Sequence, residues 1–499
     1  MSTPPPSTAR QVFIAIDCGA SSSRVMAVIW QDAGLSIHEV HRFPTPFYER
    51  NGGLHWDLQV MRDEFLTGLR EAGNRYGQDV RSIGADTWGV DYVLLDAAGE
   101  PMDDPFQYRD SRTDGIIPWM DERVSAWERF ARTGIQNQFF NTANQLCADL
   151  HLGNRLVAKA DCLLYMPDWI NYLLCGVKRN ELTEASTAQL LDQDRKYHQG
   201  LLEEYGIPAG VFAPLVEPGT VLAPLKDDLQ QDLGISPQVV TVASHDTGSA
   251  YVAAPCMDER TAFLSSGTWS LFGVEANKLE VSETAYKYGL TNEAGVEGTT
   301  RLLRNIVGLW MIQECVREWR AQGETVDFGE LDKASAREPG WRILLNPDHG
   351  PFLVPGDMPE KIRNFCRRTG QPIPNTKGAI VRAIQDTLAL TYRRTLVALR
   401  ELTGLQLERI NIVGGGAQSR LLNQLTADAT ECEVLAGPIE ATALGNAIMQ
   451  MKALGLIENM AEGRKLIQAS FPLETYSPRP VPDREALLSR FEDVCQPLA

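Results

Sequence analysis

The chain has 499 residues, of which 43% are hydrophobic and 22% charged, and its formal net charge is −18. This length exceeds what one hydrophobic core can serve, so it predicts two domains of roughly 200 to 250 residues each. The negative charge argues against nucleic acid and anionic membranes as partners, because both attract a positive field. No segment reaches the roughly 18 continuous apolar residues of a membrane span. The Pro- and Ser-rich start lacks an apolar signal segment, and the nine cysteines form no close pair. We therefore expect a cytoplasmic protein with free cysteines.

The first motif is a hairpin with a polar tip. Apolar residues 12–16 and 25–30 predict two strands, joined by the turn Asp17-Cys-Gly-Ala-Ser-Ser-Ser-Arg24. Backbone N–H groups and hydroxyls at such a tip can bind phosphate. Asp17 would then suit a phosphate-bound Mg²⁺, held through water because this ion keeps much of its hydration. A polar surface hairpin without a ligand is equally compatible with the pattern.

Residues 83–95 read as strand, polar turn and strand, with Asp86, Trp88 and Asp91 close together in the turn. An aromatic face beside carboxylates and a bare glycine is a common way to grip a sugar. A buried tryptophan between two turn aspartates is the alternative. The following Tyr108-Arg-Asp-Ser-Arg112 is compatible with an internal ion-pair network or with an anion site.

The middle of the chain holds the most concentrated polar motif. Residues 121–224 are mostly helical by pattern, and the hydroxyl-rich stretch Thr183 to Asp192 receives no chemical role. The apolar strand 239–243 then leads into Ser-His-Asp-Thr, which places Asp246 at a strand end. A carboxylate there is either used in a cleft or caps a helix that begins near Thr247.

A second hairpin repeats the first. Residues 261–274 again give apolar strand, Gly/Ser/Thr turn and apolar strand, and Gly267 follows Gly19 by 248 residues (267 − 19), about half the chain. This spacing predicts a duplicated architecture with one hairpin per domain. If the two tips face each other, donors led by Thr268 would surround a polyphosphate, and Asp246 would lie between them.

Three further segments follow. Residues 302–319 are predicted as one amphipathic helix, with Asn305 and Gln313 as polar exceptions near a possible ligand. The turn Gly414 to Gly416 suits either a nucleotide base against bare backbone or a tight corner between strand and helix. The small residues of 436–445 suit close helix packing.

Other catalytic templates are missing from the sequence. It contains no G-x-x-x-x-G-K-[ST] loop and no G-x-S-x-G motif, and its seven histidines show no paired metal-ligand spacing. Phosphate binding by the hairpin tips is therefore the chemistry that the sequence still supports.

These motifs together resemble the signatures of the FGGY carbohydrate kinases, which belong to the sugar kinase, actin and Hsp70 superfamily. The matching segments occur in order between Val12 and about Ile457 and are residues 17–24, 86–91, 244–249, 265–270 and 414–416. The resemblance implies an α/β protein with a ribonuclease H-like fold, in which two duplicated domains enclose a cleft. The motifs are most similar to those of the branch that phosphorylates L-rhamnulose at O1, although Ser23 stands where that branch usually carries glycine.

The resemblance also implies domain limits and residue roles. Residues 1–10 would be a disordered extension, 11–255 a sugar-binding domain and 256–490 a nucleotide-binding domain. Asp246 would be the general base, and Asp17 would hold Mg²⁺ through water. The other expected sugar contacts are Trp88, Gly89, His245, Thr247 and Asn305. The expected ATP contacts are Ala20, Ser21, Ser22, Ser23, Arg24, Thr268, Gln313 and Gly415.

The expected partners are a small sugar and MgATP, bound by a monomer or small homo-oligomer, with no nucleic acid and no membrane. Two alternatives stay open. The sugar could be another ketose, such as L-fuculose or a xylulose, or the chain could be an actin- or Hsp70-like ATPase that binds no sugar. Ser244 to Thr247 favour the kinase, because a switch ATPase needs no base aimed at a sugar hydroxyl.

Overall fold

The computed structural model describes residues 9–32, 34–153, 155–255 and 258–496. The chain forms two compact units. Unit 1 comprises Met1–Pro255, Ala276–Leu302 and Ala441–Phe471, and unit 2 comprises Cys256–Glu275, Leu303–Glu440 and Pro472–Ala499. The domain boundary expected after residue 255 coincides with the end of the first segment, whereas two later segments return to unit 1. Most of the expected disordered extension, residues 1–8, lies outside the described residues, as does Cys256.

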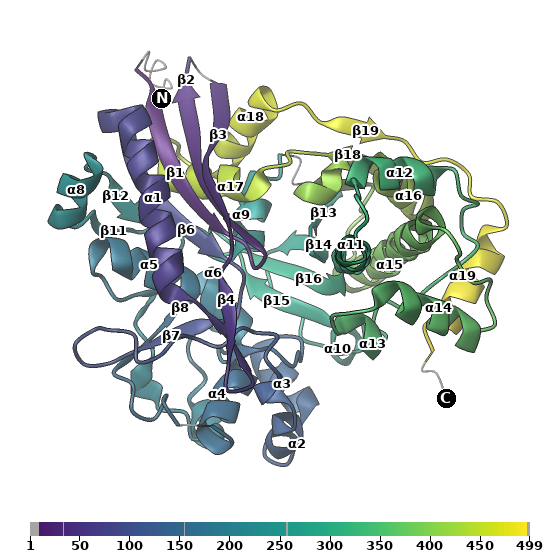
Figure 1. Cartoon of the computed structure of the whole chain (residues 1–499), viewed down its shortest axis with the longest axis horizontal. Helices are drawn as coiled ribbons and strands as arrows, with labels where there is room; N and C mark the ends of the chain where they lie inside the picture. Colours follow the sequence, from purple (N-terminus) through teal and green to yellow (C-terminus); the bar gives the residue numbers. More distant parts are fainter. Residues whose placement is uncertain (1–8, 33, 154, 256–257, 497–499) are drawn as a thin grey trace. The chain divides into compact units, whose positions relative to one another are not determined.

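The main sheet of unit 1 is built around a fully buried central strand, β1 (Figure 1). Its strands, in spatial order, are β11 (Val221–Pro224), β12 (Gln238–Val240), β6 (Val80–Thr87), β1 (Gln11–Cys18), β2 (Ser22–Gln31) and β3 (Gly34–Pro44). β1 pairs antiparallel with β2 and parallel with β6. This confirms the first predicted hairpin, and its turn shortens to residues 19–21 because both strands extend to its rim.

Helices cover both faces of this sheet, which explains why β1 reads as a continuous apolar run. Val12, Ile14 and Ile16 pack in one core cluster with α1 (Leu58–Tyr76). The alternate residue Ala15 packs with α17 (Ala441–Ala453) on the other face. A late segment of the chain therefore belongs to unit 1, because its apolar side packs on the sheet of that unit.

A second core of unit 1 is mainly helical, as the pattern over 121–224 predicts, but short strands interrupt it. Its elements are η2 (Ser111–Thr113), α2 (Ile116–Asp121), α3 (Ala126–Thr133), α4 (Thr142–His151), β8 (Cys162–Tyr165), α5 (Met166–Cys175), β9 (Asn180–Glu181), α6 (Leu182–Ala185), η3 (Ser186–Ala188), α7 (Gln199–Tyr205), η4 (Ala209–Val211) and β10 (Leu215–Val216). The remaining elements of unit 1 are β4 (Phe47–Arg50), β5 (Gly53–Trp56), η1 (Gly77–Asp79), β7 (Tyr92–Leu95), α8 (Asp227–Leu233), α9 (Asp246–Ala253), α10 (Glu283–Lys287), β15 (Leu290–Ala294) and α18 (Met460–Ser470).

The sheet of unit 2 repeats the strand arrangement of unit 1, which confirms the predicted duplication. Its order is β16 (Thr300–Val307, in unit 2 from Leu303), β14 (Trp269–Ala276), β13 (Thr261–Ser266), β17 (Arg409–Val413), β18 (Glu433–Ala436) and β19 (Glu474–Tyr476). β13 is antiparallel to β14 and parallel to β17, as β1 is to β2 and β6. The edge strand β19 is antiparallel to β18, as β11 is to β12.

The helices of unit 2 include one long helix, α15, which ends at Gly404 in the left-handed conformation (φ 70°). The helices are α11 (Trp310–Ala321), α12 (Phe328–Ala336), α13 (Gly350–Leu353), α14 (Met358–Arg368), α15 (Lys377–Thr403), η5 (Gly415–Gln418), α16 (Arg420–Thr430) and α19 (Arg484–Val494).

The single helix predicted over 302–319 is wrong. Residues up to Val307 continue β16, and α11 begins only at Trp310. The break lies at Gly308, where a Cβ atom would lie 2.8 Å from the backbone of both Trp269 and Ser270, so only glycine fits this approach. Sheet pairing overrides the helical spacing of the apolar residues before it. Asn305 is consequently a strand residue.

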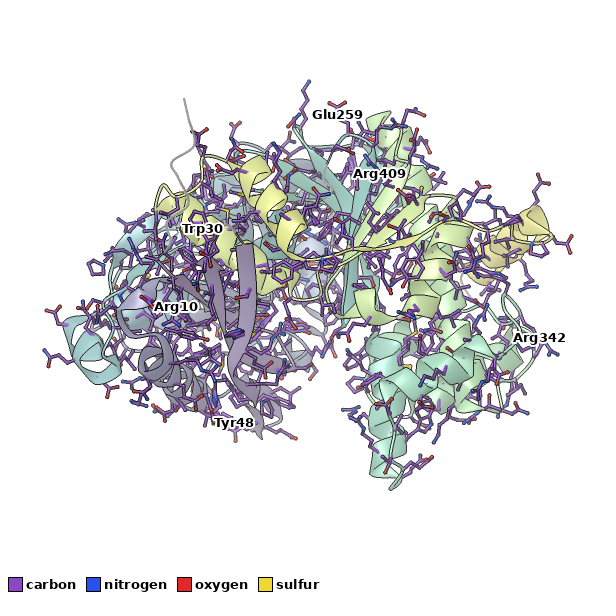
Figure 2. The ribbon with its side chains drawn as sticks, turned by 90° about the horizontal axis from the view of Figure 1, so that it is seen from above. Arg10, Trp30, Tyr48, Glu259, Arg342 and Arg409 are labelled. Carbon is purple, nitrogen blue, oxygen red and sulfur yellow. The ribbon has the colours of Figure 1, made fainter. Side chains whose placement is uncertain are left out.

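Two of the arginines labelled in Figure 2 form ion pairs. Arg10 bonds Asp79 in unit 1, and Arg409 bonds Asp258 in unit 2. The eight cysteines in the described ranges are free thiols, mostly buried. Among the described residues, no helix combines the length and apolar character needed to cross a membrane.

Candidate active site

Three carboxyl groups gather at one edge of the unit 1 sheet. Asp17 and Asp86 stand opposite each other near the carboxyl ends of the parallel strands β1 and β6. The N–H of Thr87 donates to the carbonyl of Ser244 (2.9 Å), which holds the loop before Asp246 beside β6. Open α/β sheets place their ligand sites at this edge.

The three carboxyl side chains differ in their exposure to solvent. The Asp86 carboxyl is fully buried, and the Asp17 side chain is only 7% exposed and bonds Arg24, its cross-strand partner. The Asp246 side chain is 34% exposed. Of these three carboxyls, Asp246 is therefore the one that a substrate can reach directly.

The surroundings of Asp86 disfavour its ionised form. Its Oδ2 accepts a hydrogen bond from Asn446 on α17 (2.6 Å), while its buried Oδ1 has no hydrogen-bond partner among the described residues. Burial first, and then the charges of Asp17 and Asp246, raise the pKa of Asp86 well above its ordinary value. An unsatisfied carboxylate oxygen beside Asp17 fits a hard cation such as Mg²⁺, which prefers oxygen ligands.

In the described part of the chain, no group of three or more His, Cys, Asp or Glu side chains is arranged to hold a metal by itself. Asp17 and Asp86 would supply at most two carboxylates, so water and substrate oxygens would complete the shell of a Mg²⁺ ion.

Asp246 is the first residue of α9 rather than its N-cap. His245 occupies the cap position and makes no side-chain capping bond, and Asp246 accepts a bond from the hydroxyl of Thr247 (3.1 Å). Although a third of the Asp246 side chain is accessible, the surrounding protein removes much of the water around its carboxyl, which raises its pKa. This effect outweighs the lowering by His245. The helix N-terminus favours an ionised Asp246, but it does not prevent this rise.

Behind Asp246 lies a buried charge network that sequence reasoning missed. His245 Nε2 is 3.5 Å from Asp246 Oδ1, and His245 Nδ1 is 3.2 Å from Glu293 Oε2. Arg301 approaches both His245 Nδ1 (3.2 Å) and Glu293 (3.1 Å). No local pattern identifies Glu293 or Arg301, because β15 and β16 bring them to His245 from about 50 residues away in sequence.

The turn that carries Trp88 is held by buried hydrogen bonds. Trp88 is 6% exposed, and its Nε1 and that of Trp56 both donate to Asp91 Oδ2 (2.9 and 2.7 Å). This geometry matches the buried-tryptophan alternative. Arg112 donates to the backbone and side chain of Gln145 (3.0 and 2.6 Å), which is an internal network.

The first hairpin tip presents only part of the expected phosphate contacts. Ala20 and Ser22 are half-buried and Ser21 is exposed. Ser23, in contrast, is fully buried and hydrogen-bonded to Thr45 (2.8 Å) and to Cys18 (3.0 Å), so its hydroxyl serves the hairpin itself.

Unit 2 gathers its own predicted residues around the second hairpin tip. The carbonyl of Thr268 accepts the N–H groups of Gly308 (3.2 Å) and Trp310 (3.1 Å), which fixes the start of α11 and therefore the helix that carries Gln313. Asn305 lies on β16, just before this junction, and is half-buried.

The glycine turn after β17 packs against the same tip. Gly416 fits tightly, because a Cβ there would lie 1.9 Å from the Ser266 hydroxyl, and a Cβ on Gly414 would lie 3.1 Å from the Ser266 carbonyl. Gly415 is exposed, with no atom within 4 Å of its Cβ position. Packing explains the two outer glycines, and the open backbone of Gly415 is free for a ligand.

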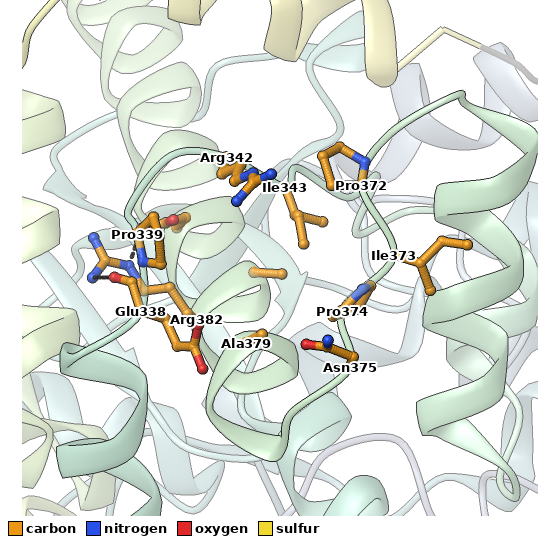
Figure 3. Close-up of a pocket in the computed structure, with 12 residues that line it drawn as sticks. Glu338, Pro339, Arg342, Ile343, Pro372, Ile373, Pro374, Asn375, Ala379 and Arg382 are labelled. Carbon is orange, nitrogen blue, oxygen red and sulfur yellow. Dashed lines mark hydrogen bonds and ion pairs between the residues drawn. The ribbon is translucent and has the colours of Figure 1, made fainter.

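A separate pocket of about 200 Å³ lies elsewhere in unit 2 (Figure 3). Arg342, Ile373 and Arg382 contribute to its wall, and none of the predicted site residues lines it. Its Arg382 already donates to Asp386 (2.8 Å), so this cation is paired within the wall.

Comparison with protein families matches both halves of the chain. Residues 12–253 match the N-terminal domain of the FGGY family of carbohydrate kinases, and residues 262–454 match its C-terminal domain. The chain is 40% identical over 486 residues to a rhamnulokinase of Bacteroides thetaiotaomicron, covering 97% of this chain and 99% of that protein. It is 37% identical over 483 residues to a rhamnulokinase of Bacillus subtilis, covering 96% and 98%.

Solved structures show the same fold at low sequence identity. A xylulose kinase from Lactobacillus acidophilus superimposes with a TM-score of 0.81 at 15% identity, covering 97% of each chain. A glycerol kinase from Plasmodium falciparum superimposes with a TM-score of 0.76 at 14% identity, covering 97% of each chain. Together with the family matches over both halves, these findings establish that the chain belongs to the FGGY family of carbohydrate kinases and is an ATP-dependent sugar kinase.

Proposed function

We propose that the protein transfers the γ-phosphate of MgATP to the O1 hydroxyl of L-rhamnulose, with Asp246 as the general base. The choice of sugar rests on the rhamnulokinases to which the chain is 37 to 40% identical over nearly its whole length. The choice of base rests on one geometric observation: at an edge with three carboxyls, only the Asp246 side chain is substantially exposed.

The reaction forms a bond between O1 and the γ-phosphorus and breaks the bond from that phosphorus to the oxygen bridging to ADP. The O1 proton passes to Asp246 Oδ. Because the transition state is loose, the protein contributes mainly alignment and charge neutralisation, and the base acts late. His245, 3.5 Å from Asp246, supplies a nearby donor that orients the carboxylate.

The remaining assignments distribute the ligands over both units. Trp88, Gly89, His245, Thr247 and Asn305 are proposed for the sugar. Ala20 to Arg24, Thr268, Gln313 and Gly415 are proposed for ATP, and the open backbone at Gly415 supports the last. Asp17 and Asp86 would hold Mg²⁺ through water, and the bound ion would neutralise phosphate charge. The burial of Ser23 and Trp88 limits these two to a supporting role.

The test is ADP release with MgATP against L-rhamnulose, L-fuculose, D- and L-xylulose, L-ribulose and glycerol. We expect kcat/KM to be at least about tenfold higher for L-rhamnulose, on the order of 1.4 kcal/mol of transition-state binding. A higher value for another sugar would overturn the rhamnulose assignment and leave the proposed base standing. Identification of the product by ¹³C–³¹P coupling at C1 checks the position of transfer.

A further inference from the structure

The hydroxyl-rich stretch beginning at Thr183 received no chemical role from the sequence, yet it is among the most deeply buried polar segments of unit 1. Glu181, Thr183 and Glu184 are all fully buried in the short elements between β9 and η3. Buried polar groups cost stability unless they are hydrogen-bonded. The partners of these side chains therefore indicate what the segment holds in place.

On one side, the segment binds the loop that carries the proposed base. Glu181 Oε2 accepts the N–H of Ser244 (3.1 Å), and Thr183 Oγ1 accepts the N–H of His245 (3.3 Å). The Thr183 hydroxyl donates its own hydrogen to Glu181 Oε2 (2.6 Å), so a lone pair is directed to His245. The backbone N–H groups of the two residues before Asp246 are thus bound by side chains.

On the other side, the same segment binds the turn after Trp88. The N–H of Val90 donates both to Glu184 Oε1 (3.1 Å) and to Thr187 Oγ1 (3.2 Å). Val90 has φ of 77°, a strained conformation for a β-branched residue that persists only where its surroundings enforce it. A Cβ atom on the neighbouring Gly89 would lie 3.1 Å from the Thr187 side chain, so this turn fits closely.

We infer that residues 181–187, here the anchor segment, fix the loop before Asp246 and the turn at Val90 in one geometry, and that Thr183 is a positioning residue for the base. This inference rests on the proposed role of Asp246. Phosphoryl transfer depends on alignment, and a displacement of about 1 Å can cost about 10²-fold in rate. Two loops held by one rigid segment keep base and sugar aligned.

The electrostatics of the segment agree with a positioning role. Burial raises the pKa of Glu181 to about 7 and raises that of Glu184 well above its ordinary value. Ionisation of these two buried glutamates costs stability. What they provide instead is a fixed acceptor for a backbone N–H of each loop, Glu181 for Ser244 and Glu184 for Val90.

The test compares Thr183→Val with Thr183→Ser. Valine keeps the shape and removes the acceptor for the His245 N–H, whereas serine keeps it. We expect Thr183→Val to lower kcat by about 10- to 100-fold, with KM for sugar and for MgATP within about threefold of wild type. Thr183→Ser should restore kcat to within about threefold, and amide exchange at His245 should be faster only in the valine variant.

The matched control is Thr430→Val. The Thr430 hydroxyl is also buried and also bonds backbone, donating to Thr426 O (2.6 Å) and accepting from Cys432 N (3.4 Å). It lies at the end of α16 in unit 2, whereas both loops belong to unit 1. This variant should lower stability to urea without lowering kcat. Equal kcat for Thr183→Val and Thr183→Ser, or an equal loss of kcat in Thr430→Val, would overturn the inference.

If Thr183→Val does not fold, Thr187→Val against Thr187→Ser provides the test, because Glu184 still accepts the Val90 N–H. The valine variant should raise the KM for sugar at least about threefold, and equal KM values in the pair would overturn the inference. Failure of the proposed function looks different. It appears in the wild type as ADP release that no sugar stimulates, or in Asp246→Asn as retained turnover.

Discussion

Exposure decides which of three neighbouring aspartates can act on a substrate. Asp17 bonds Arg24 and Asp86 bonds Asn446, so both are committed to the interior, whereas Asp246 remains accessible. All three residues are aspartates, so any difference in their chemistry comes from their surroundings in the fold.

The first prediction concerns Asp246 itself. Asp246→Asn removes the proton acceptor and keeps the shape, so turnover should fall by about 10²- to 10⁴-fold. Binding of sugar and MgATP, measured by calorimetry, should change by less than about threefold. Turnover within tenfold of the wild type would remove Asp246 from the role of base. The exposed Asp63→Asn serves as the control and should leave turnover unchanged.

The same residue predicts a pH dependence. Burial raises the pKa of Asp246, and the base works only when ionised, so kcat/KM should fall as pH drops through a value above the ordinary aspartate pKa of about 3.9. Because the folded-state pKa is raised, ionisation of Asp246 opposes folding. Its stability contribution is present below the unfolded pKa and is lost as pH rises through the folded one. Urea unfolding should therefore show Asp246→Asn gaining stability relative to wild type as pH rises.

At the level of elements, α17 packs closely against α9 within unit 1. A Cβ atom on Gly445 would lie 1.8 Å from the Ser249 carbonyl and 3.2 Å from the Ala253 nitrogen, and both are backbone atoms of α9. This confirms close helix packing for Gly445, at the end of the predicted segment 436–445, whereas Ala436 at its start belongs to β18. The same helix carries Asn446 to Asp86.

Gly445→Ala should consequently separate α17 from α9. We expect a loss of about 1–3 kcal/mol in the free energy of unfolding, as for other overpacked cores, together with lower kcat because Asn446 moves with the helix. Denaturant unfolding measures the first and steady-state kinetics the second. Gly210→Ala is the control, since no atom lies within 4 Å of its Cβ position. Equal stability of the two variants would contradict the close packing.

Considered as a whole molecule, the protein distributes its proposed ligand contacts over two units with the same strand arrangement. Most proposed sugar contacts lie in unit 1, and the proposed ATP contacts comprise Ala20 to Arg24 in unit 1 and Thr268, Gln313 and Gly415 in unit 2. We therefore expect variants of these unit 2 residues to affect ATP rather than the sugar.

Thr268→Val should raise the KM for MgATP about two- to tenfold, the value of one hydrogen bond, with the KM for sugar unchanged. His245→Asn should raise the KM for sugar and leave the KM for MgATP unchanged. The measurement is two-substrate steady-state kinetics on both variants. If each variant raised both KM values equally, the assignment of Thr268 to ATP and of His245 to the sugar would be wrong.

The sequence by itself determined the family, the duplicated hairpins and the position of Asp246, because these depend on short motifs whose residues are neighbours in the chain. It did not determine that residues 302–307 form a strand, since their spacing suits a helix and only pairing within a sheet decides otherwise. Nor could it separate a buried Ser23 from its accessible neighbours. Glu293, Arg301, Asn446 and the anchor segment reach the site from distant positions. Only the tertiary structure decides such contacts, because burial, pKa and hydrogen-bond partners depend on which surfaces the fold brings together.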